Sequence, residues 1–285
     1  CAGAAISGAS SPRTFKGRTS ASIFIEGKEY RMDYEAFFNS LRGSGALGVT
    51  KFTQVQVDVA QMLIVKGYGL RPDALAYVMG TAWGEAKLTP QRENMSYSAA
   101  RIREVWPSRF PTVADAKPYE RQPVKLANKV YNGRLGNQEG SNDGWDFRGG
   151  GLDQLTGRVN YRKRGLEQTP ERILEPEVAA RSIITGMTLG DYRGPKLSDY
   201  FNDRGADFVA ARAIVNTDVT ANGQRYARYA TAFLNALNAA GYMPNAATTP
   251  TVPAEDRKVS TGAIHPALAG VGLAVLAAAY YLLKG

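Results

Sequence analysis

Apolar residues recur at spacings of three and four along most of this chain, which is the pattern of amphipathic helices. After Thr53 the positions Val55, Val59 and Leu63 follow this period, and Gly67 is placed to cap the end of that helix. Further helices are predicted at residues 34–41, 98–105, 124–131, 176–189, 207–215 and 224–240. The pattern therefore predicts a mainly α fold.

One helix combines this pattern with a charge at an unusual place. Pro72 and Asp73 are typical first residues of a helix. Its apolar stripe consists of Leu75, Val78, Met79 and Ala82. Glu85 continues the stripe, seven residues after Val78 and three after Ala82. A carboxylate thus lies where a purely structural helix would normally carry leucine.

Two segments depart from the helical period. Alternation in residues 22–26 and 28–32, on either side of Gly27, predicts a small β-hairpin. Residues 144–157 are rich in the glycines of turns and of close backbone approach. If residues 152–156 are extended, Gln154 and Thr156 share one face and line a cleft, while Leu155 points into the core.

The pattern also divides the chain into regions. Residues 1–45 form an N-terminal arm with the hairpin and a short helix, and residues 46–244 form the main domain. Residues 245–262 are a Pro-rich linker. Residues 263–284 include a charge-free run from Ala267 to Leu283, which predicts a transmembrane helix. Small residues in it would suit pairing with a second copy, and a buried core helix is the alternative.

Composition narrows the chemistry. The net charge of +9 favours an anionic partner, but no block of Lys and Arg interleaved with aromatics indicates nucleic-acid binding. The single Cys and single His are Cys1 and His265, at opposite ends, so a Ser-His-Asp triad, a Cys-His site and a His-ligated zinc site are excluded from the main domain. Cys1 is either a lipidated lipoprotein start or the residue left after removal of an initiator Met. Carboxylate chemistry remains.

Hydrolysis of a glycosidic bond needs one carboxylic acid and one ionised carboxylate. Glu85, at the end of an apolar helical face, is expected to have a raised pKa, which suits a general acid. Glu93 lies in residues 89–94, which are expected to form a solvated loop where a carboxylate stays charged. Glu93 therefore suits the general base.

Four segments together resemble the family 19 glycoside hydrolases, a chitinase-like fold common among phage endolysins. The segments are residues 52–85, residues 93–99 (ENMSYSA), residues 128–137 (NKVYNGRLGN) and residues 143–161 (DGWDFRGGGLDQLTGRVNY). The resemblance covers about residues 46–240. It implies a lysozyme-like or chitinase-like helical domain with a small β-hairpin region lining the cleft.

The same resemblance implies roles for individual residues. Glu85 would be the general acid, Glu93 the general base, and Thr156 the hydroxyl that helps to hold the attacking water. The implied sugar-binding residues are Tyr97, Gln154, Asn160 and Asn216, and Arg225 would pair with the catalytic acid. No metal or cofactor is expected. Two departures from the family pattern are Gly84, where the family usually has His, and residues 86–88 (AKL), where Gly-Gly is expected.

These observations predict a hydrolase of peptidoglycan glycan strands, acting as an endolysin or as a virion-associated lysozyme. A glycan-binding structural protein of a virion or envelope assembly is one alternative, favoured by Gly84, and a chitinase is another. The expected partners are peptidoglycan, a membrane through the last helix, and virion proteins or a second copy through that helix. The catalytic domain is expected to act in the bacterial periplasm.

Overall fold

The computed structural model describes residues 21–25 and 28–244, and it is mainly helical, as predicted. The α-helices are α1 (Tyr34–Ser44), α2 (Gln54–Lys66), α3 (Pro72–Ala86), α4 (Ala99–Val105), α5 (Val113–Ala116), α6 (Pro123–Tyr131), α7 (Asp143–Asp146), α8 (Arg158–Lys163), α9 (Pro176–Leu189), α10 (Leu197–Tyr200) and α11 (Val219–Ala239). Short 3₁₀-helices are η1 (Lys117–Tyr119), η2 (Pro170–Leu174) and η3 (Ala210–Ile214).

Within residues 21–25 and 28–244, the strands form three small antiparallel pairs. The first is β1 (Ala21–Ile25) with β2 (Lys28–Met32), the second is β3 (Gln91–Arg92) with β4 (Gly150–Gly151), and the third is β5 (Phe201–Asn202) with β6 (Gly205–Ala206). In the first pair Ile25 is the antiparallel partner of Lys28, so the predicted N-terminal hairpin is confirmed.

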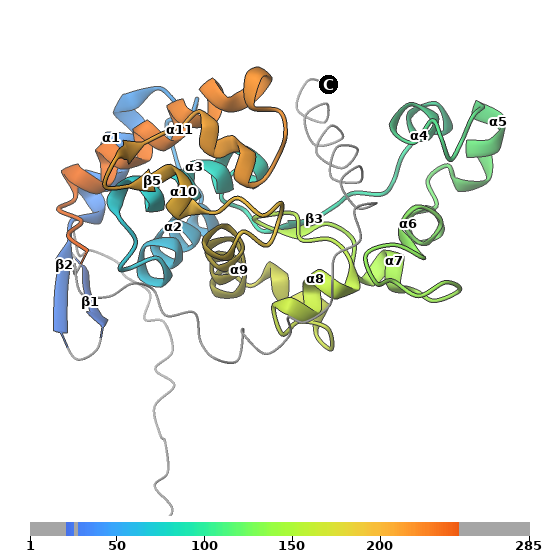
Figure 1. Ribbon diagram of the computed structural model, residues 1–285, viewed down its shortest axis with the longest axis horizontal. Helices are drawn as coiled ribbons and strands as arrows, with labels where there is room; N and C mark the ends of the chain where they lie inside the picture. Colours follow the sequence, from blue (N-terminus) through green and yellow to red (C-terminus); the bar gives the residue numbers. More distant parts are fainter. Residues whose placement is uncertain (1–20, 26–27, 245–285) are drawn as a thin grey trace, which may run out of the picture.

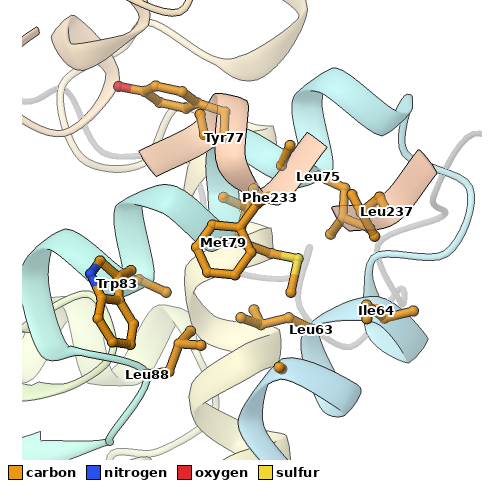
Figure 2. Packing of buried hydrophobic residues seen from close by; sticks show 14 of the residues in the cluster. Leu63, Ile64, Leu75, Tyr77, Met79, Trp83, Leu88, Phe233 and Leu237 are labelled. Atoms are coloured by element: carbon orange, nitrogen blue, oxygen red, sulfur yellow. The ribbon is translucent and has the colours of Figure 1, made fainter. Parts of the chain in front are cut away.

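The main hydrophobic cluster surrounds α3. Every residue from Ala74 to Trp83 is buried, so this helix is enclosed on all sides rather than amphipathic. Helix α11 packs most extensively on it, and a Cβ at Gly80 would lie only 2.7 Å from the backbone nitrogen of Ala230. Figure 1 shows α1, α2, α9 and α11 grouped around α3. Figure 2 shows side chains of α2, α3 and α11 that pack close together, among them Leu63, Met79 and Phe233.

Local sequence signals set the ends of these helices. Thr53 caps α2 with its side chain, and Gln56 bonds back to the Thr53 backbone in a capping box. Pro72 is the first residue of α3. An N–H at this position has no acceptor within the helix, so the missing N–H of proline costs no hydrogen bond. Helix α1 carries Phe37 and Phe38 into the same cluster as α3 and α11.

A second hydrophobic cluster lies at the other end of the molecule. It is built from the region of α4–α6 and includes Ile102, Phe110, Leu126 and Val130. Figure 1 shows α4–α7 gathered away from α1, α2 and α11. A third, smaller cluster, which includes Phe147, Leu155 and Tyr161, comes from the β4–α8–η2 region. Along the chain, β3 lies between α3 and α4, and β4 lies between α7 and α8.

Several sequence predictions can be compared directly with these elements. The predicted helices at residues 53–67, 98–105, 124–131, 176–189 and 224–240 are confirmed, with small shifts of their ends. Residues 207–215 were predicted as helix but contain only the 3₁₀-helix η3. The extended conformation proposed for residues 152–156 is wrong, because Leu152–Gln154 form a turn and Gln154 has a φ of 51°.

Within residues 21–25 and 28–244, no helix is long and apolar enough to cross a membrane. The predicted transmembrane helix at 263–284, the linker at 245–262, Cys1 and His265 lie outside the described residues.

Candidate active site

Glu85 is fixed in the last turn of α3, beside the main hydrophobic cluster. Its side chain is 8 % exposed. Two groups donate hydrogen bonds to the same carboxylate oxygen, Oε1: the Arg212 guanidinium at 2.6 Å and the Tyr226 hydroxyl at 2.7 Å. Charged and neutral donors of this kind compensate the loss of water around a buried carboxylate.

Arg212 joins Glu85 to a second carboxylate. Its side chain is 2 % exposed, and its Nε donates to Asp218 Oδ1 at 2.6 Å. Burial opposes ionisation of Asp218, yet the hydrogen bond and charge of Arg212 hold the pKa of Asp218 below its usual value. Asn222 donates a further hydrogen bond to Asp218. The result is a buried chain of polar groups that begins at Glu85.

Arg212 is an arginine that pairs with Glu85, and the sequence analysis did not assign it this role. The role that the resemblance implies for Arg225 stays a prediction. Arg225 lies next to Tyr226, with its guanidinium carbon 5.4 Å from the centroid of the tyrosine ring. Arg212 comes from η3, four residues before Asn216, which the resemblance had implied as a sugar-binding residue. The 127-residue separation between Arg212 and Glu85 gave no local signal of their contact.

Glu93 follows β3 and is held by groups from distant parts of the chain. Its backbone N–H donates to the Gly149 carbonyl at 2.8 Å, which continues the β3–β4 pairing. The Tyr131 hydroxyl lies 3.0 and 2.8 Å from its two carboxylate oxygens, and Arg148 donates to its backbone carbonyl. Glu93 is half-buried, so the expected solvated loop is wrong for this residue.

Burial raises the pKa of Glu93 to about 7, while the hydrogen bonds from Tyr131 and Gly149 and the charge of Arg148 act in the opposite direction. A carboxyl group with such a pKa changes protonation state near neutral pH. Its ionised form is also a stronger proton acceptor than an ordinary carboxylate, which suits general base chemistry.

Replacing Tyr131 by Phe should raise the pKa of Glu93 further, above about 7, because the hydroxyl donates to the ionised carboxylate and favours that form. The measurement is a titration of the glutamate carboxyl carbons by NMR, assigned with Glu93→Gln. Tyr119→Phe is a matched control, because Tyr119 packs against the same hydrophobic cluster. An unchanged or lower pKa of Glu93 in Tyr131→Phe would contradict this expectation.

Gln154 is placed beside Glu93 by the turn that follows β4. A Cβ at Gly149 would lie 2.9 Å from Gln154 Oε1 and 3.4 Å from Glu93 Oε2, so both side chains lie close to the same face of Gly149. Thr156 donates its hydroxyl proton to the Gln154 carbonyl at 2.9 Å, and Asn160 donates to the Thr156 carbonyl at 2.7 Å. These three predicted residues thus form one connected group.

Tyr97 and Asn216 are both buried. Tyr97 is 6 % exposed and packs its ring edge-on against Trp106. Burial raises the pKa of its hydroxyl to about 12, and the nearby charge of Glu93 adds to that increase. Asn216 is 5 % exposed, and its side-chain oxygen accepts from the Thr217 N–H. Its own N–H donates to the Arg212 carbonyl, which ties it to the partner of Glu85.

Two residues between Glu85 and Glu93 have an unusual backbone conformation. Lys87 and Leu88 have φ angles of 52° and 53°, in the left-handed region that favours glycine. This is where the resembled family has Gly-Gly. Here the conformation is held by tertiary contacts: Leu88 is fully buried, and Gln56 donates a hydrogen bond to the Lys87 carbonyl.

Three residues of the site were missed by the sequence analysis. Tyr131 lies in a segment that carried the resemblance, and Arg212 lies in the helix predicted at residues 207–215, but neither segment revealed the contacts with Glu93 and Glu85. Tyr226 had no signal at all, since a tyrosine on a helix is usually a core residue.

Comparison with known proteins adds an independent observation. No protein-family model matches the chain. A 93-residue stretch is 41 % identical to a Haemophilus influenzae protein described as a glycosyl hydrolase family 19 domain-containing protein. The match covers 32 % of this chain and 46 % of that relative, so it spans about half the length of the curated relative. The matched stretch of this chain is thus similar to part of a protein that is described as carrying a family 19 glycosyl hydrolase domain.

Proposed function

We propose that this protein hydrolyses the glycan strands of bacterial peptidoglycan, with Glu85 as general acid and Glu93 as general base. The observation that carries the proposal is the contrast between the two carboxyl groups. Glu85 is fixed at the end of a buried helix by Arg212 and Tyr226. Glu93 is held by Tyr131 in a site that brings its pKa to about 7. Two carboxyl groups in different environments are what glycosidic hydrolysis requires.

In the proposed reaction, Glu93 removes a proton from a water molecule whose oxygen bonds to the anomeric carbon. The bond from that carbon to the leaving oxygen breaks, and Glu85 gives its proton to the leaving oxygen. Thr156 helps to hold the water, and Gln154, Asn160, Tyr97, Asn216 and Arg225 contribute to sugar binding. Attack from the opposite face inverts the anomeric centre, which requires carboxyl groups about 6.5–9.5 Å apart. No metal or cofactor takes part.

The proposed substrate follows from charge. The sequence has 35 Lys and Arg residues against 26 Asp and Glu residues, so it carries an excess of nine positive charges. Such a surface raises the local concentration of an anionic polymer. Peptidoglycan with its acidic peptide stems and attached wall polymers fits this charge better than neutral chitin does.

Purified peptidoglycan and chitin oligomers test this proposal together. The wild type should release soluble fragments from peptidoglycan. Glu85→Gln should reduce that rate at least about 1,000-fold, because the amide N–H protons are too weakly acidic for general acid catalysis. Glu104→Gln is the matched control, since Glu104 is a 63 % exposed surface carboxylate paired with Arg101. Its activity should equal that of the wild type.

Each other outcome has a definite meaning. Turnover of chitin oligomers without release from peptidoglycan would make the protein a chitinase. Tight binding of peptidoglycan without cleavage would favour a glycan-binding structural protein. Full activity of Glu85→Gln would remove Glu85 as the acid. Analysis of the new reducing ends identifies the bond that is cut, and their initial anomeric form reports inversion or retention.

We also propose that residues 263–284 anchor the domain to a membrane and that the domain acts on the periplasmic side, either on a phage particle or after export. The support is the apolar composition of that segment, with Tyr280 and Tyr281 suited to the membrane interface. Protease added to inside-out membrane vesicles checks this, because the periplasmic side of such vesicles faces their lumen. The domain should be protected from the protease, and its digestion would contradict the proposed side.

A further inference from the structure

The ring of Tyr226 occupies the space next to Gly84 on the neighbouring helix. A Cβ at Gly84 would lie 2.3 Å from Cε1 and 2.7 Å from Cζ of Tyr226, distances at which one of the two groups must move. Tyr226 is 2 % exposed, so its ring has little free volume on any side. Only glycine at position 84 permits this packing. The departure from the usual His of the resembled family thus coincides with a second side chain that fills the vacated space.

The other contacts of the same ring direct its hydroxyl toward Glu85. The guanidinium carbon of Arg212 stands 4.0 Å from the ring centroid, within the range of a cation–π contact. Gly84 and Arg212 together therefore fix the ring, and the Tyr226 hydroxyl reaches Glu85 Oε1 at 2.7 Å. Burial and the neighbouring Glu85 raise the pKa of the Tyr226 hydroxyl, which keeps it a protonated donor.

Both donors reach one oxygen of the carboxyl group. Arg212 Nη1 donates to Oε1 at 2.6 Å, beside the Tyr226 hydroxyl at 2.7 Å, and both of these bonds go to Oε1 rather than to Oε2. An arginine does not give up its proton in proteins, so its bond to Oε1 persists at all working pH values. An oxygen that already accepts two hydrogen bonds is a poor place for an acidic proton. The acidic proton of Glu85 is therefore expected on Oε2.

We propose that Tyr226 is a positioning residue for Glu85, admitted by Gly84, that makes Oε2 the oxygen from which the proton is delivered. This inference rests on the proposed function. In the step, the O–H bond at Oε2 breaks, a new O–H bond forms on the leaving sugar oxygen, and the bond between that oxygen and the anomeric carbon breaks. The carboxylate left behind is stabilised by the two donors already aimed at Oε1.

Tyr226→Phe tests the hydroxyl while keeping the ring and its packing. We expect kcat on peptidoglycan to fall about 10- to 100-fold, as for the loss of one hydrogen bond to a charged group, with KM changed less than about twofold. Tyr229→Phe is the matched control, because Tyr229 lies one turn along α11 and its ring meets that of Tyr226 at a centroid distance of 6.0 Å. Its kcat should match the wild type.

A second substrate separates positioning of an acid from a general structural effect. An aryl glycoside of the same sugars with a nitrophenol leaving group needs little protonation of the leaving oxygen. The Tyr226→Phe defect should therefore shrink to less than about threefold on this substrate. An equal loss on both substrates would show that the hydroxyl does not act through the acid, and would overturn the proposal.

Position 84 supplies an independent variant. Gly84→Ala should displace the ring and lower kcat at least as far as Tyr226→Phe does, whereas adding Gly84→Ala to Tyr226→Ala should change kcat less than about twofold further, because the clash is then gone. If Gly84→Ala alone kept wild-type kcat, the packing argument would be wrong.

Loss of the positioning role of Tyr226 and loss of the proposed function would give different results. Wild-type kcat in Tyr226→Phe, in a protein that Glu85→Gln inactivates, would remove the positioning role and leave the proposed function intact. Absence of turnover by the wild type on peptidoglycan, chitin and aryl glycosides would remove the proposed function, and this inference with it.

Discussion

Replacement of Arg212 by methionine is expected to lower the free energy of unfolding by about 3–5 kcal/mol at pH 7, because it leaves two carboxylates without their buried cation. Arg212 is 2 % exposed and contacts both Glu85 and Asp218 at 2.6 Å. Methionine has a similar length and no charge, so the effect reports the lost ion pairs rather than a large cavity. Urea denaturation measures it directly.

The size of this effect should depend on pH. Because Arg212 holds the pKa of Asp218 below its usual value, the stability that it contributes through Asp218 is present above the unfolded pKa and is lost as the pH falls through the folded one. The difference between Arg212→Met and the wild type should therefore narrow toward pH 3. Arg172→Met is the control, since Arg172 pairs with Glu175 on the surface and both side chains are 50 % exposed. Its loss should stay below about 1 kcal/mol.

Replacing Glu93 by glutamine should make the protein more stable above neutral pH and, under the proposed function, should abolish hydrolysis of peptidoglycan. The folded-state pKa of about 7 lies above the ordinary value of 4.5, so between these values the folded protein keeps a proton that the unfolded chain has released. Wild-type stability therefore falls as the pH rises from about 4.5 to about 7. Glutamine carries no such penalty and can still accept a hydrogen bond from Tyr131.

Raising a pKa from 4.5 to about 7 corresponds to a difference of up to about 3 kcal/mol. We expect Glu93→Gln and the wild type to be equally stable near pH 4, and the variant to be more stable by up to this amount at pH 8. Urea denaturation across this pH range tests it, with Glu104→Gln as a surface control. A stability difference that is the same at pH 4 and pH 8 would be incompatible with the shifted pKa.

The sequence predicted the elements whose signals are local. Helix α9 has the predicted limits of Pro176–Leu189, because a proline at its start and a glycine after its end bound an apolar period. The position of Glu85 at the end of a buried helix followed from the same spacing. The short turns were less accessible: Gln154 adopts a left-handed φ of 51°, which its residue type does not signal.

The environments of the two glutamates depended on contacts that no local pattern contains. Glu93 lies 38 residues from Tyr131 in sequence, and Glu85 lies 141 residues from Tyr226. Charge and flanking residues made Glu93 look solvated, yet the fold brings Tyr131 and Gly149 against it. Sequence reasoning could thus name both glutamates as candidates, whereas their pKa values and partners required the tertiary structure.

The stretch that joins Glu85 and Glu93 also limits how far the two carboxyl groups can move relative to each other. Lys87 and Leu88 hold a conformation that is unfavourable for residues with side chains, by roughly 1–2 kcal/mol each. Burial of Leu88 in the main cluster offsets this strain. A bridge built in this way resists bending, because any swing of one end would expose Leu88 to water. Under the proposed function, distortion of the sugar ring, rather than movement of this stretch, would bring a linkage into reach of both carboxyl groups.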